Sequence, residues 1–322
     1  MTARVAKLGL DLSALASGFH HRRFQAREVG FDAWIWRGSP GPVLLLNGGT
    51  HGDEYEGPTL LREWAETWRP LHLRGTVVMV PVLNEAAFFA GQRFHPRDGG
   101  NLARAFPGKA RGTVTERLAH LFDTQLLAQA THYVDLHSGG AAYELLPWVG
   151  YLTRDDKVGR TQRAMAACFD RFWSWAGPFL PGRTLSAAHA RNIPAIYAEC
   201  RGAGGIAAND LSALNRGLTN LLRWSGCLAG APLTLARQKT RTSADPDEAH
   251  LQVHHPAPHD GLFVRKVELG TRVRRGQILG VVHKLNGGRL LRIKAERNGR
   301  VVLVRYQRSV RKGDALFTLA PI

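Results

Sequence analysis

The chain has 322 residues, of which 43 are Lys or Arg and 26 are Asp or Glu, so its formal net charge is +17 at pH 7. Its hydrophobic content of 44% is that of a globular protein long enough for one large domain and a smaller one. Three cysteines are too few for a disulfide framework, and no apolar run suits a signal peptide or a membrane span, so we expect a cytoplasmic protein.

The basic excess is mostly arginine and is scattered along the chain. Its densest parts are residues 272–275 and 289–300. A nucleic-acid surface would be accompanied by stacking aromatic residues or a helix-turn-helix pattern, and neither accompanies these arginines. We therefore expect an arginine-rich solvated surface that attracts small anions, with no nucleic-acid or membrane partner.

The first informative element is residues 43–58, VLLLNGGTHGDEYEGP. Its apolar run, residues 43–46, has the length and bulk of a strand buried on both faces, and the glycines that follow predict a tight turn. His51 and Glu54 come on the loop that leaves this strand, before a helix that starts near Tyr55. An imidazole and a carboxylate on such a loop can provide two of the three protein ligands of a catalytic zinc site, whose fourth position stays open for water.

An amphipathic helix and a strand at residues 76–80 follow. The apolar stripe of this helix consists of Leu60, Leu61, Trp64 and Trp68. Further on, Thr113 and Glu116 have the spacing of a capping box, which predicts the start of another helix.

Between these elements lies a long irregular loop, residues 86–108. Among its glycines and prolines it carries Arg93, Asp98, Asn101 and Arg104. Such side chains suit a loop that binds a carboxylate or a carbonyl, because a guanidinium group is a fixed, always-charged donor. A solvated loop with incidental arginines explains the composition equally well.

Residues 133–140, YVDLHSGG, indicate another strand that runs into a glycine loop. His137 lies at the end of this strand and is the best candidate for the third zinc ligand. Because alternate residues of a strand share a face, Asp135 is placed to accept the second ring N–H of a ligand histidine. Each of His51, Glu54 and His137 alone has an ordinary structural explanation. The three together, each after a strand and beside glycine, favour a metal site.

The chain continues with strands and helices in alternation. We expect an apolar stretch over residues 145–152, a helix over residues 158–173 and a strand over residues 195–199. Glu199 ends this last strand. It is either a structural carboxylate or a general base, and its place at the same sheet edge as the candidate ligands favours the base.

Alternating strands and helices predict an α/β fold, with a mostly parallel mixed sheet flanked by helices. The functional edge of such a sheet is the one where the carboxyl ends of the strands meet. His51, Glu54, His137 and Glu199 all fall at strand ends, so we expect them at one site.

The C-terminal part departs from this pattern. Residues 240–247 have the composition of a linker, and short strands follow in which residues 261–277 are echoed near the end of the chain. Two such halves resemble the lipoyl and biotinyl carrier fold, although the surroundings of Lys284 lack an attachment signature. We expect a large domain over residues 1–239 and a small all-β barrel-sandwich domain over residues 240–322.

Four motifs taken together resemble the succinylglutamate desuccinylase/aspartoacylase family of zinc carboxypeptidase-like hydrolases. They are GGTHGDEYEGP, DGGNLARAFPG, VDLHSGG and AECRGAGG. The C-terminal APHDGLF and the β domain resemble the N-acetyl-diaminobutyrate deacetylase branch in particular. The resemblance covers nearly the whole chain. It implies a zinc-dependent amide hydrolase that deacylates an N-acylated amino acid or a similar small molecule, with residues 1–239 as its catalytic domain.

The resemblance also implies roles for individual residues at the site. His51, Glu54 and His137 would bind Zn²⁺. Glu199 would be the general base, and Arg93 would polarise the scissile carbonyl.

On the substrate side, the resemblance implies that Arg104 holds a carboxylate, and we expect Asn101 to bind substrate beside it. One departure matters. Ala103 stands where the family usually has an asparagine, so a partner of Arg104 is missing and the usual N-acyl amino acid is in doubt as the substrate.

Two other interpretations stay open. A metallocarboxypeptidase would use the same site on the C-terminus of a peptide. A non-catalytic, metal-containing binding protein would contact a partner through the basic surface and the C-terminal domain, but a closed structural zinc site normally has four protein ligands and only three good ones are found. The acyl group, the amine and the formation of a homo-oligomer are left open.

Overall fold

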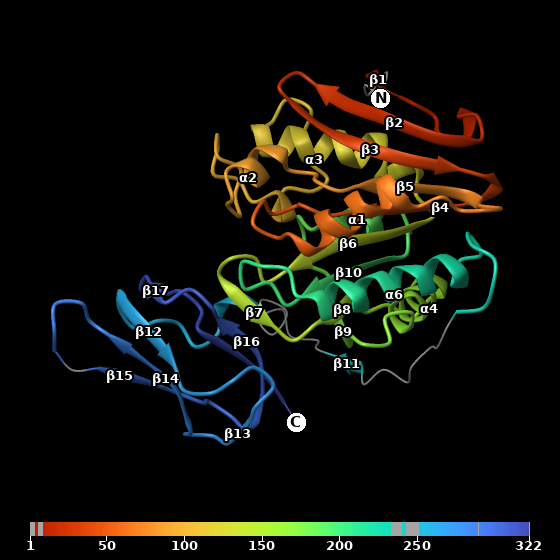
Figure 1. Cartoon of the computed structure of the whole chain (residues 1–322). Coiled ribbons are helices and arrows are strands. Elements are labelled where there is room, and N and C mark those ends of the chain that lie inside the picture. Colours follow the sequence, from red (N-terminus) through yellow and green to blue (C-terminus); the bar gives the residue numbers. More distant parts are fainter. Residues whose placement is uncertain (1–3, 6–8, 233–239, 243–250, 289, 322) are drawn as a thin grey trace.

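The computed structural model describes residues 4–5, 9–232, 240–242, 251–288 and 290–321. Over these residues the chain forms a large sheet with helices on both faces, followed by small β-sheets that lie beside one end of it (Figure 1). The α/β class is therefore confirmed, and the described C-terminal part is rich in strands.

The large sheet has the strand order β1-β2-β3-β5-β4-β6-β10-β8-β9-β11. Its strands are β1 (Arg4–Val5), β2 (Gly18–Ala26), β3 (Val29–Arg37), β4 (Ser39–Asn47), β5 (Arg74–Val80), β6 (His132–Ser138), β8 (Trp148–Leu152), β9 (Trp173–Gly177), β10 (Ala195–Cys200) and β11 (Thr240–Thr242). The central strands β5, β4, β6 and β10 are parallel, whereas β2 and β3, β3 and β5, and β8 and β10 pair antiparallel.

The prediction of a mostly parallel sheet is therefore wrong, because the sheet is mixed. Only Arg27 and Glu28 join β2 to β3, and strands joined by so short a turn must run antiparallel. β4 follows β3 after one residue, again with no helix between them. Apolar runs predict strands but not their directions, and the assumed alternation of strands with helices fails over this part of the chain.

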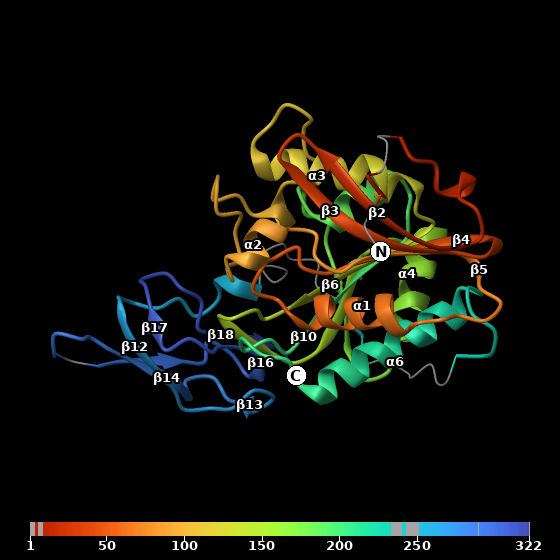
Figure 2. The same ribbon diagram turned by 45° about the horizontal axis from the view of Figure 1, so that its top comes forward.

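Helices cover both faces of the sheet (Figure 2). They are α1 (Glu56–Thr67), α2 (Glu85–Phe89), α3 (Val114–Gln125), α4 (Lys157–Ala167), α5 (Thr184–Ala190) and α6 (Ala208–Trp224), with short 3₁₀ helices at Leu12–Ala14, Leu102–Arg104, Leu127–Gln129 and Leu251–Val253. One core contains Phe122 of α3 and Leu45, and the other contains Leu218 of α6 and Leu44. Neighbouring residues of β4 thus face opposite cores, as expected for a strand buried on both faces.

Local sequence signals predict some helix ends well and others poorly. α1 begins at Glu56, and the capping box of Thr113 and Glu116 is formed at the start of α3. The helix expected over residues 158–173 ends at Ala167 instead. Phe169 and Phe172 have helical spacing, but they lie in a turn of the core before β9.

The C-terminal residues form two small antiparallel sheets. One contains β12 (Gly261–Arg265), β14 (Ile278–His283), β15 (Leu291–Lys294) and β17 (Ser309–Val310), and the other contains β13 (Arg272–Val273), β16 (Gly299–Arg305), β18 (Phe317–Ala320) and β7 (Tyr143–Leu145). They share a core in which the rings of Phe263 and Phe317 lie 5.5 Å apart.

β7 joins the two parts of the molecule, because it belongs to the first part of the chain and pairs with β16 of the last. The predicted linker is partly wrong, since Thr240–Thr242 form β11 and pair with β9. Residues 243–247 of that linker lie outside the described residues. The division into domains at residue 240 stays a prediction.

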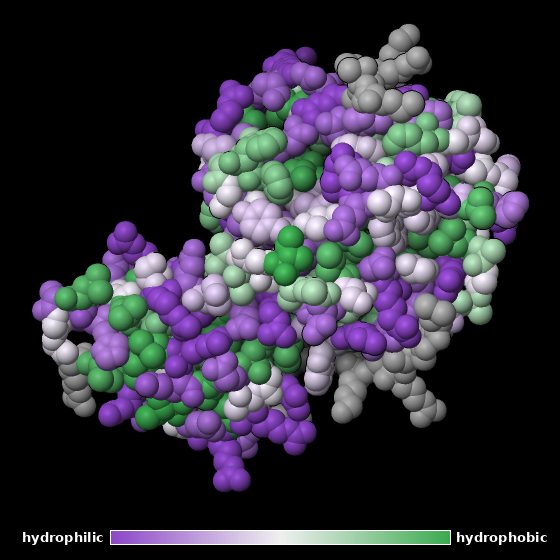
Figure 3. Space-filling view, viewed as in Figure 1, coloured by the Kyte–Doolittle hydropathy of each residue, from purple (hydrophilic) through white to green (hydrophobic). Residues whose placement is uncertain are grey.

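Figure 3 shows hydrophilic and hydrophobic residues interleaved over the visible face, including the C-terminal sheets. Within the described ranges, none of the helices combines the length and the apolar character that crossing a membrane requires.

Candidate active site

Strand ends that are far apart in the sequence meet at one edge of the large sheet. β4, β6 and β10 are parallel neighbours, and His137 near the end of β6 pairs in register with Glu199 near the end of β10. The loop that leaves β4 brings His51 and Glu54 to the same edge. The predicted convergence of these four residues is therefore seen in the fold.

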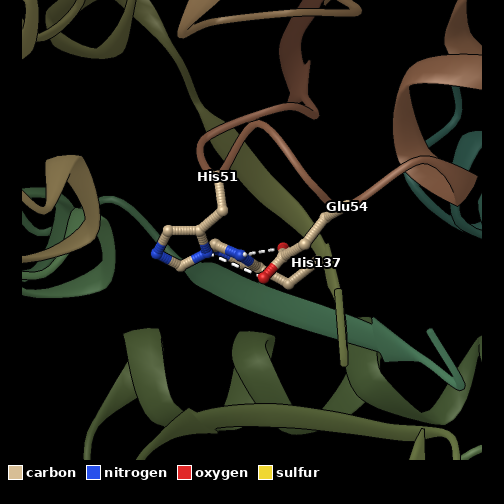
Figure 4. Close-up of side chains that lie close together, drawn as sticks. All are labelled: His51, Glu54 and His137. Atoms are coloured by element: carbon tan, nitrogen blue, oxygen red, sulfur yellow. Dashed lines mark hydrogen bonds and ion pairs between the residues drawn. The ribbon is translucent and has the colours of Figure 1, made fainter. Parts of the chain in front are cut away.

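His51, Glu54 and His137 form a tight cluster (Figure 4). One potential ligand atom from each lies within 4.8 Å of the other two. His51 Nδ1 is 2.8 Å from Glu54 Oε1, and His137 Nδ1 is 2.9 Å from Glu54 Oε2. His51 and Glu54 are buried, and the side chain of His137 is only 10% exposed.

Asn101 fixes which nitrogen of His51 carries a proton. Its Oδ1 accepts a hydrogen bond from the backbone N–H of Ala103 at 3.1 Å, which identifies this atom as the oxygen. The same oxygen lies 3.0 Å from His51 Nε2, so Nε2–H is the donor. A neutral His51 ring therefore directs the lone pair of Nδ1 toward Glu54.

Asp135 plays the same part for His137, as the strand alternation predicts. Its Oδ2 lies 2.9 Å from His137 Nε2. The carboxylate also accepts hydrogen bonds from Asn47, Thr50 and Thr184. Because all its partners are donors, Asp135 orients the ring of His137 and leaves Nδ1 facing Glu54.

The electrostatics of the cluster follow from this arrangement. Burial lowers the pKa of His51, and the nearby Arg93 lowers it further. Burial opposes ionisation of Glu54, but the two imidazoles outweigh it and hold the pKa of Glu54 well below its usual value. Burial also disfavours a charged His137, yet Asp135 and Glu54 outweigh it and hold the pKa of His137 well above the usual value. A cation bound here would displace a proton from His137.

This donor set fits a divalent metal ion. Two imidazole nitrogens and a carboxylate, each turned to one point by a further hydrogen-bond partner, are ligands that zinc accepts, and three protein ligands are typical of catalytic rather than structural zinc. His51, Glu54 and His137 are thus the residues that could hold such an ion.

A cavity of about 260 Å³ opens beside the cluster. Arg93, Arg104 and Glu199 line it together with aromatic side chains such as Trp148 and Tyr197. It also reaches the C-terminal part, at residues 251–253 and at Leu303. The polar and apolar residues that line the cavity are, in full, His51, Arg93, Ala103, Arg104, Asp135, His137, Leu145, Trp148, Tyr151, Leu152, Trp175, Gly177, Pro178, Arg183, Thr184, Leu185, Tyr197, Glu199, Leu251, Gln252, Val253 and Leu303. The cavity is large enough for a small acylated molecule.

Two charged groups, Arg93 and Glu199, line the cavity together with His51 and His137 of the cluster. Arg93 donates from a terminal guanidinium nitrogen to Glu54 Oε1 at 3.0 Å. Burial raises the pKa of Glu199 to about 8, although His137 opposes the shift. A cation in the cluster would lower the pKa of Glu199 again, because a nearby positive charge favours the carboxylate.

The other two predicted site residues lie in different places: Arg104 lines the cavity, and Asn101 contacts His51 of the cluster. Arg104 lines the cavity, as a substrate-binding residue must. Asn101 does not line it, and its side-chain oxygen is used by His51 and Ala103. Sequence reasoning missed Arg183, which lines the cavity from a Gly- and Pro-rich stretch without periodicity, and no local pattern marked it.

Comparison with known proteins identifies the family of the chain. Residues 40–225 match the succinylglutamate desuccinylase/aspartoacylase catalytic domain. The chain belongs to the succinylglutamate desuccinylase/aspartoacylase family. This confirms the resemblance carried by the four sequence motifs.

Members of this family resemble the chain over most of its length. N-alpha-acetyl-L-2,4-diaminobutyric acid deacetylase of Halomonas elongata is 32% identical over 295 residues, which are 88% of this chain and 83% of the relative. The product-bound ectoine utilization protein EutE (DoeB) of Ruegeria pomeroyi has a TM-score of 0.86 and 29% identity, with 98% of each chain covered. A succinylglutamate desuccinylase of Silicibacter sp. has a TM-score of 0.84 and 29% identity, with 94% of each chain covered.

Proposed function

We propose that this member of the deacylase family is a zinc-dependent hydrolase that cleaves the amide bond of an N-acylated amino acid or a similar small molecule. The observation that carries the proposal is the cluster of His51, Glu54 and His137, whose Nδ1 atoms and carboxylate face one another at the edge of a cavity that also contains Glu199 and Arg93. The names of its relatives support the same reaction class.

Zinc is the proposed cofactor, with His51, Glu54 and His137 as its ligands. When bound, it would lower the pKa of a water molecule to about 7 and polarise the carbonyl of the substrate. The chain's own contribution is to orient the ligands. Asn101 holds the ring of His51 and Asp135 holds the ring of His137, so that both Nδ1 atoms face Glu54.

Glu199 is the proposed general base. Its backbone pairs with that of His137, which holds the carboxylate next to the cluster, and its side chain lines the cavity where the substrate amide must lie. There it takes a proton from the attacking water and returns it to the leaving amine. Positioned proton transfer of this kind typically contributes ~10²–10⁴-fold to the rate.

Arg93 is proposed to stabilise the oxyanion that develops on the amide carbonyl. Its hydrogen bond to Glu54 Oε1 fixes the guanidinium beside the cluster, and part of the side chain stays accessible to the cavity. A fixed donor of this kind needs no reorganisation as the negative charge forms.

Arg104 is proposed to hold the substrate carboxylate, because a guanidinium group binds a carboxylate through two parallel hydrogen bonds. Ala103 next to it contributes no polar group. Asn101 stays a proposed substrate contact only through its amide nitrogen, since its oxygen is used by His51.

A substrate panel tests the reaction class. We expect the purified protein with zinc to release carboxylic acid from N-acetyl or N-succinyl amino acids and to leave short peptides with free C-termini uncleaved. Cleavage of the peptides alone would instead indicate a metallocarboxypeptidase. A zinc-loaded protein that hydrolyses neither group would support the binding-protein interpretation and contradict the proposal.

A further inference from the structure

The excess of positive charge is concentrated in the last part of the chain. Residues 251–322 contain 15 of the 43 Lys and Arg residues but only 4 of the 26 Asp and Glu residues. They therefore carry a formal +11 of the total +17 on less than a quarter of the length. A charge difference of this size between two parts of one chain indicates an anionic partner for the more basic part.

The fold brings the two densest basic stretches of the sequence together. In the antiparallel ladder of β13 and β16, Arg272 lies directly opposite Arg300. The turn that follows β13 contacts the turn that precedes β16, because Arg275 N–H donates to Asn298 Oδ1 at 2.9 Å. Hydrophilic side chains project at this end of the C-terminal part, near β13 (Figures 1 and 3). We call this surface the basic patch, and it consists of Arg272, Arg274, Arg275, Lys294 and Arg300.

The charges of the basic patch are not balanced by neighbouring carboxylates. In the described part of the chain, none of its five side chains forms an ion pair, and all except Arg300 are exposed. Glu296 is the single acidic residue between residues 269 and 313, and it lies 4.0 Å from Arg297. Like charges directly opposite in a ladder are destabilising, so the pair of Arg272 and Arg300 has a cost that a bound anion would remove.

An exposed tryptophan adjoins the basic patch. Trp173 begins β9 and is 38% exposed, and the guanidinium carbon of Arg300 lies 5.4 Å from the centre of its ring. The sequence predicts only a solvated surface here, because residues 264–305 contain no Phe, Trp or Tyr. The fold supplies the aromatic ring from a distant part of the chain. Arginines beside an accessible aromatic ring are the combination that binds the backbone and the bases of a single strand.

We propose that the basic patch and Trp173 form a binding surface for single-stranded nucleic acid. The basic side chains bind the phosphates, and one base stacks on the indole ring. This surface lies at the same sheet edge as the candidate active site, since Trp173 pairs with Trp148, which pairs with Glu199. None of its residues lines the active-site cavity. The proposal therefore does not depend on the deacylase function.

Two other anionic partners fit the surface less well. An acidic protein segment would neutralise the arginines, but it offers the exposed ring of Trp173 no base to stack on it. A nucleic-acid duplex offers phosphates, but its bases remain stacked on one another. A single strand satisfies both features of the surface, because its phosphates are accessible and its bases are free to stack on a side chain.

Fluorescence anisotropy with labelled oligonucleotides tests the proposal. The probes are oligouridylate and oligothymidylate of about 16 nucleotides, the upper end of the length that one small β-barrel domain covers, and a duplex of the same length. Arg272→Gln/Arg275→Gln removes two charges from the basic patch. The control Arg160→Gln/Arg163→Gln removes two exposed arginines of α4 and changes the net charge equally. Trp173→Leu removes the ring but keeps apolar bulk, and Trp173→Phe keeps a ring.

We expect the wild-type protein to bind at least one of the single strands more tightly than the duplex. Arg272→Gln/Arg275→Gln should weaken this binding and lower the slope of log Kd against log salt by roughly 1.4, because each phosphate contact on a single strand contributes about 0.7. Trp173→Leu should weaken it by roughly 5- to 100-fold, the size of one base stacked on an aromatic ring, and Trp173→Phe should retain most of the affinity. The α4 control should keep the wild-type affinity and slope.

An equal loss in the patch variant and the α4 control would mean that binding responds to net charge alone, and this would overturn the proposal. Equal affinity for the duplex, or no effect of Trp173→Leu, would also overturn it. Polyglutamate that competes as well as an unlabelled oligonucleotide would assign the surface to acidic proteins instead. Thermal melts of each variant verify that the compared proteins are folded.

Discussion

Glu199 lies beside His137 in the sheet, and its carboxylate faces the cavity. Because Glu199 is not a proposed metal ligand, replacing it should impair the chemical step and leave metal binding intact. We expect Glu199→Gln to lower kcat by ~10²–10⁴-fold, because glutamine cannot accept the proton of the attacking water. Zinc content and KM should change little. The check is steady-state kinetics together with metal analysis of the same preparation, and full turnover by the zinc-loaded variant would disprove the base assignment.

Asn101 allows a second test at the residue scale, directed at the metal alone. Asn101→Leu removes the oxygen that accepts His51 Nε2–H, so we expect zinc affinity to fall by roughly 10- to 100-fold. Asn101→Asp keeps an acceptor oxygen at this position and should retain most of the affinity. Competition with a chromogenic chelator measures both. Equal affinities in the two variants would show that the hydrogen bond to His51 does not matter.

The sequence allowed the proposed metal ligands to be predicted, since each follows a recognisable strand and lies beside glycine. It did not reveal that Asn101 faces His51, because that contact depends on how the irregular loop of residues 86–108 folds back. Arg183 was missed for a related reason: its neighbours Pro181 and Gly182 mark a break in regular structure but carry no chemical pattern.

At the scale of elements, Asp98 connects this loop to the start of α3. Its carboxylate accepts hydrogen bonds from the backbone and hydroxyl of Thr115 at 2.8 and 2.7 Å, and from Gly100 N–H at 3.1 Å. Burial alone would raise the pKa of Asp98, but these hydrogen bonds outweigh it and lower the pKa to about 2. The carboxylate therefore stabilises the folded state when it is ionised.

The pH dependence follows from the sign of this shift. An unfolded Asp has a pKa of about 3.9, so the contribution of Asp98 is fully present above about pH 5 and is lost as the pH falls toward about 2. Because Asp98 is an exposed residue, solvent screening reduces this contribution, and we expect Asp98→Asn to cost roughly 1 kcal/mol of unfolding free energy at pH 7 and progressively less below pH 4. Urea titrations with chelator present measure this, with the exposed Asp155→Asn as a control near zero. A cost that does not change with pH would refute it.

β7 is the element through which the C-terminal sheets attach to the site. Glu144 in this strand accepts from Arg201 at 3.0 Å and from Arg265 at 2.5 Å, so it joins the loop after Glu199 to the C-terminal part. We expect Glu144→Gln to lower the unfolding free energy by roughly 1–2 kcal/mol, because two charged hydrogen bonds to a largely buried carboxylate weaken.

Glu268 offers a matched control, since it pairs with the same Arg265 but its side chain is 73% exposed. Glu268→Gln should change the unfolding free energy by about 0.5 kcal/mol or less. Chemical denaturation monitored by tryptophan fluorescence compares the two variants. Equal effects would mean that Glu144 contributes no more than a surface ion pair.

Strand signals could be predicted from local sequence, whereas strand partners could not. The pairing of β7 with β16 joins residues near 144 to residues near 304, and neither segment alone indicates the other. The direction of β8 against β10 and the addition of β11 to the large sheet are non-local in the same way.

For the whole molecule, the sequence predicted a strand-rich C-terminal part, but it did not predict how this part meets the rest of the chain. Leu303 and residues 251–253 complete the wall of the cavity within the same chain. The C-terminal part thus contributes directly to the site, which sits where the ends of β4, β6 and β10 approach β7. The net charge of +17 gives the whole molecule an excess of positive charge that attracts small anions.

Metal analysis of the purified protein tests the central claim most directly. We expect about one zinc ion per chain, reversible loss of deacylase activity on chelation and a fall in Tm of the metal-free protein, because zinc would stabilise only the folded state in which the three ligands converge. His51→Ala and His137→Ala should each lose the ion, whereas the surface variant His72→Ala should keep it. Retention of stoichiometric zinc by both ligand variants, or full activity of the metal-free protein, would contradict the account.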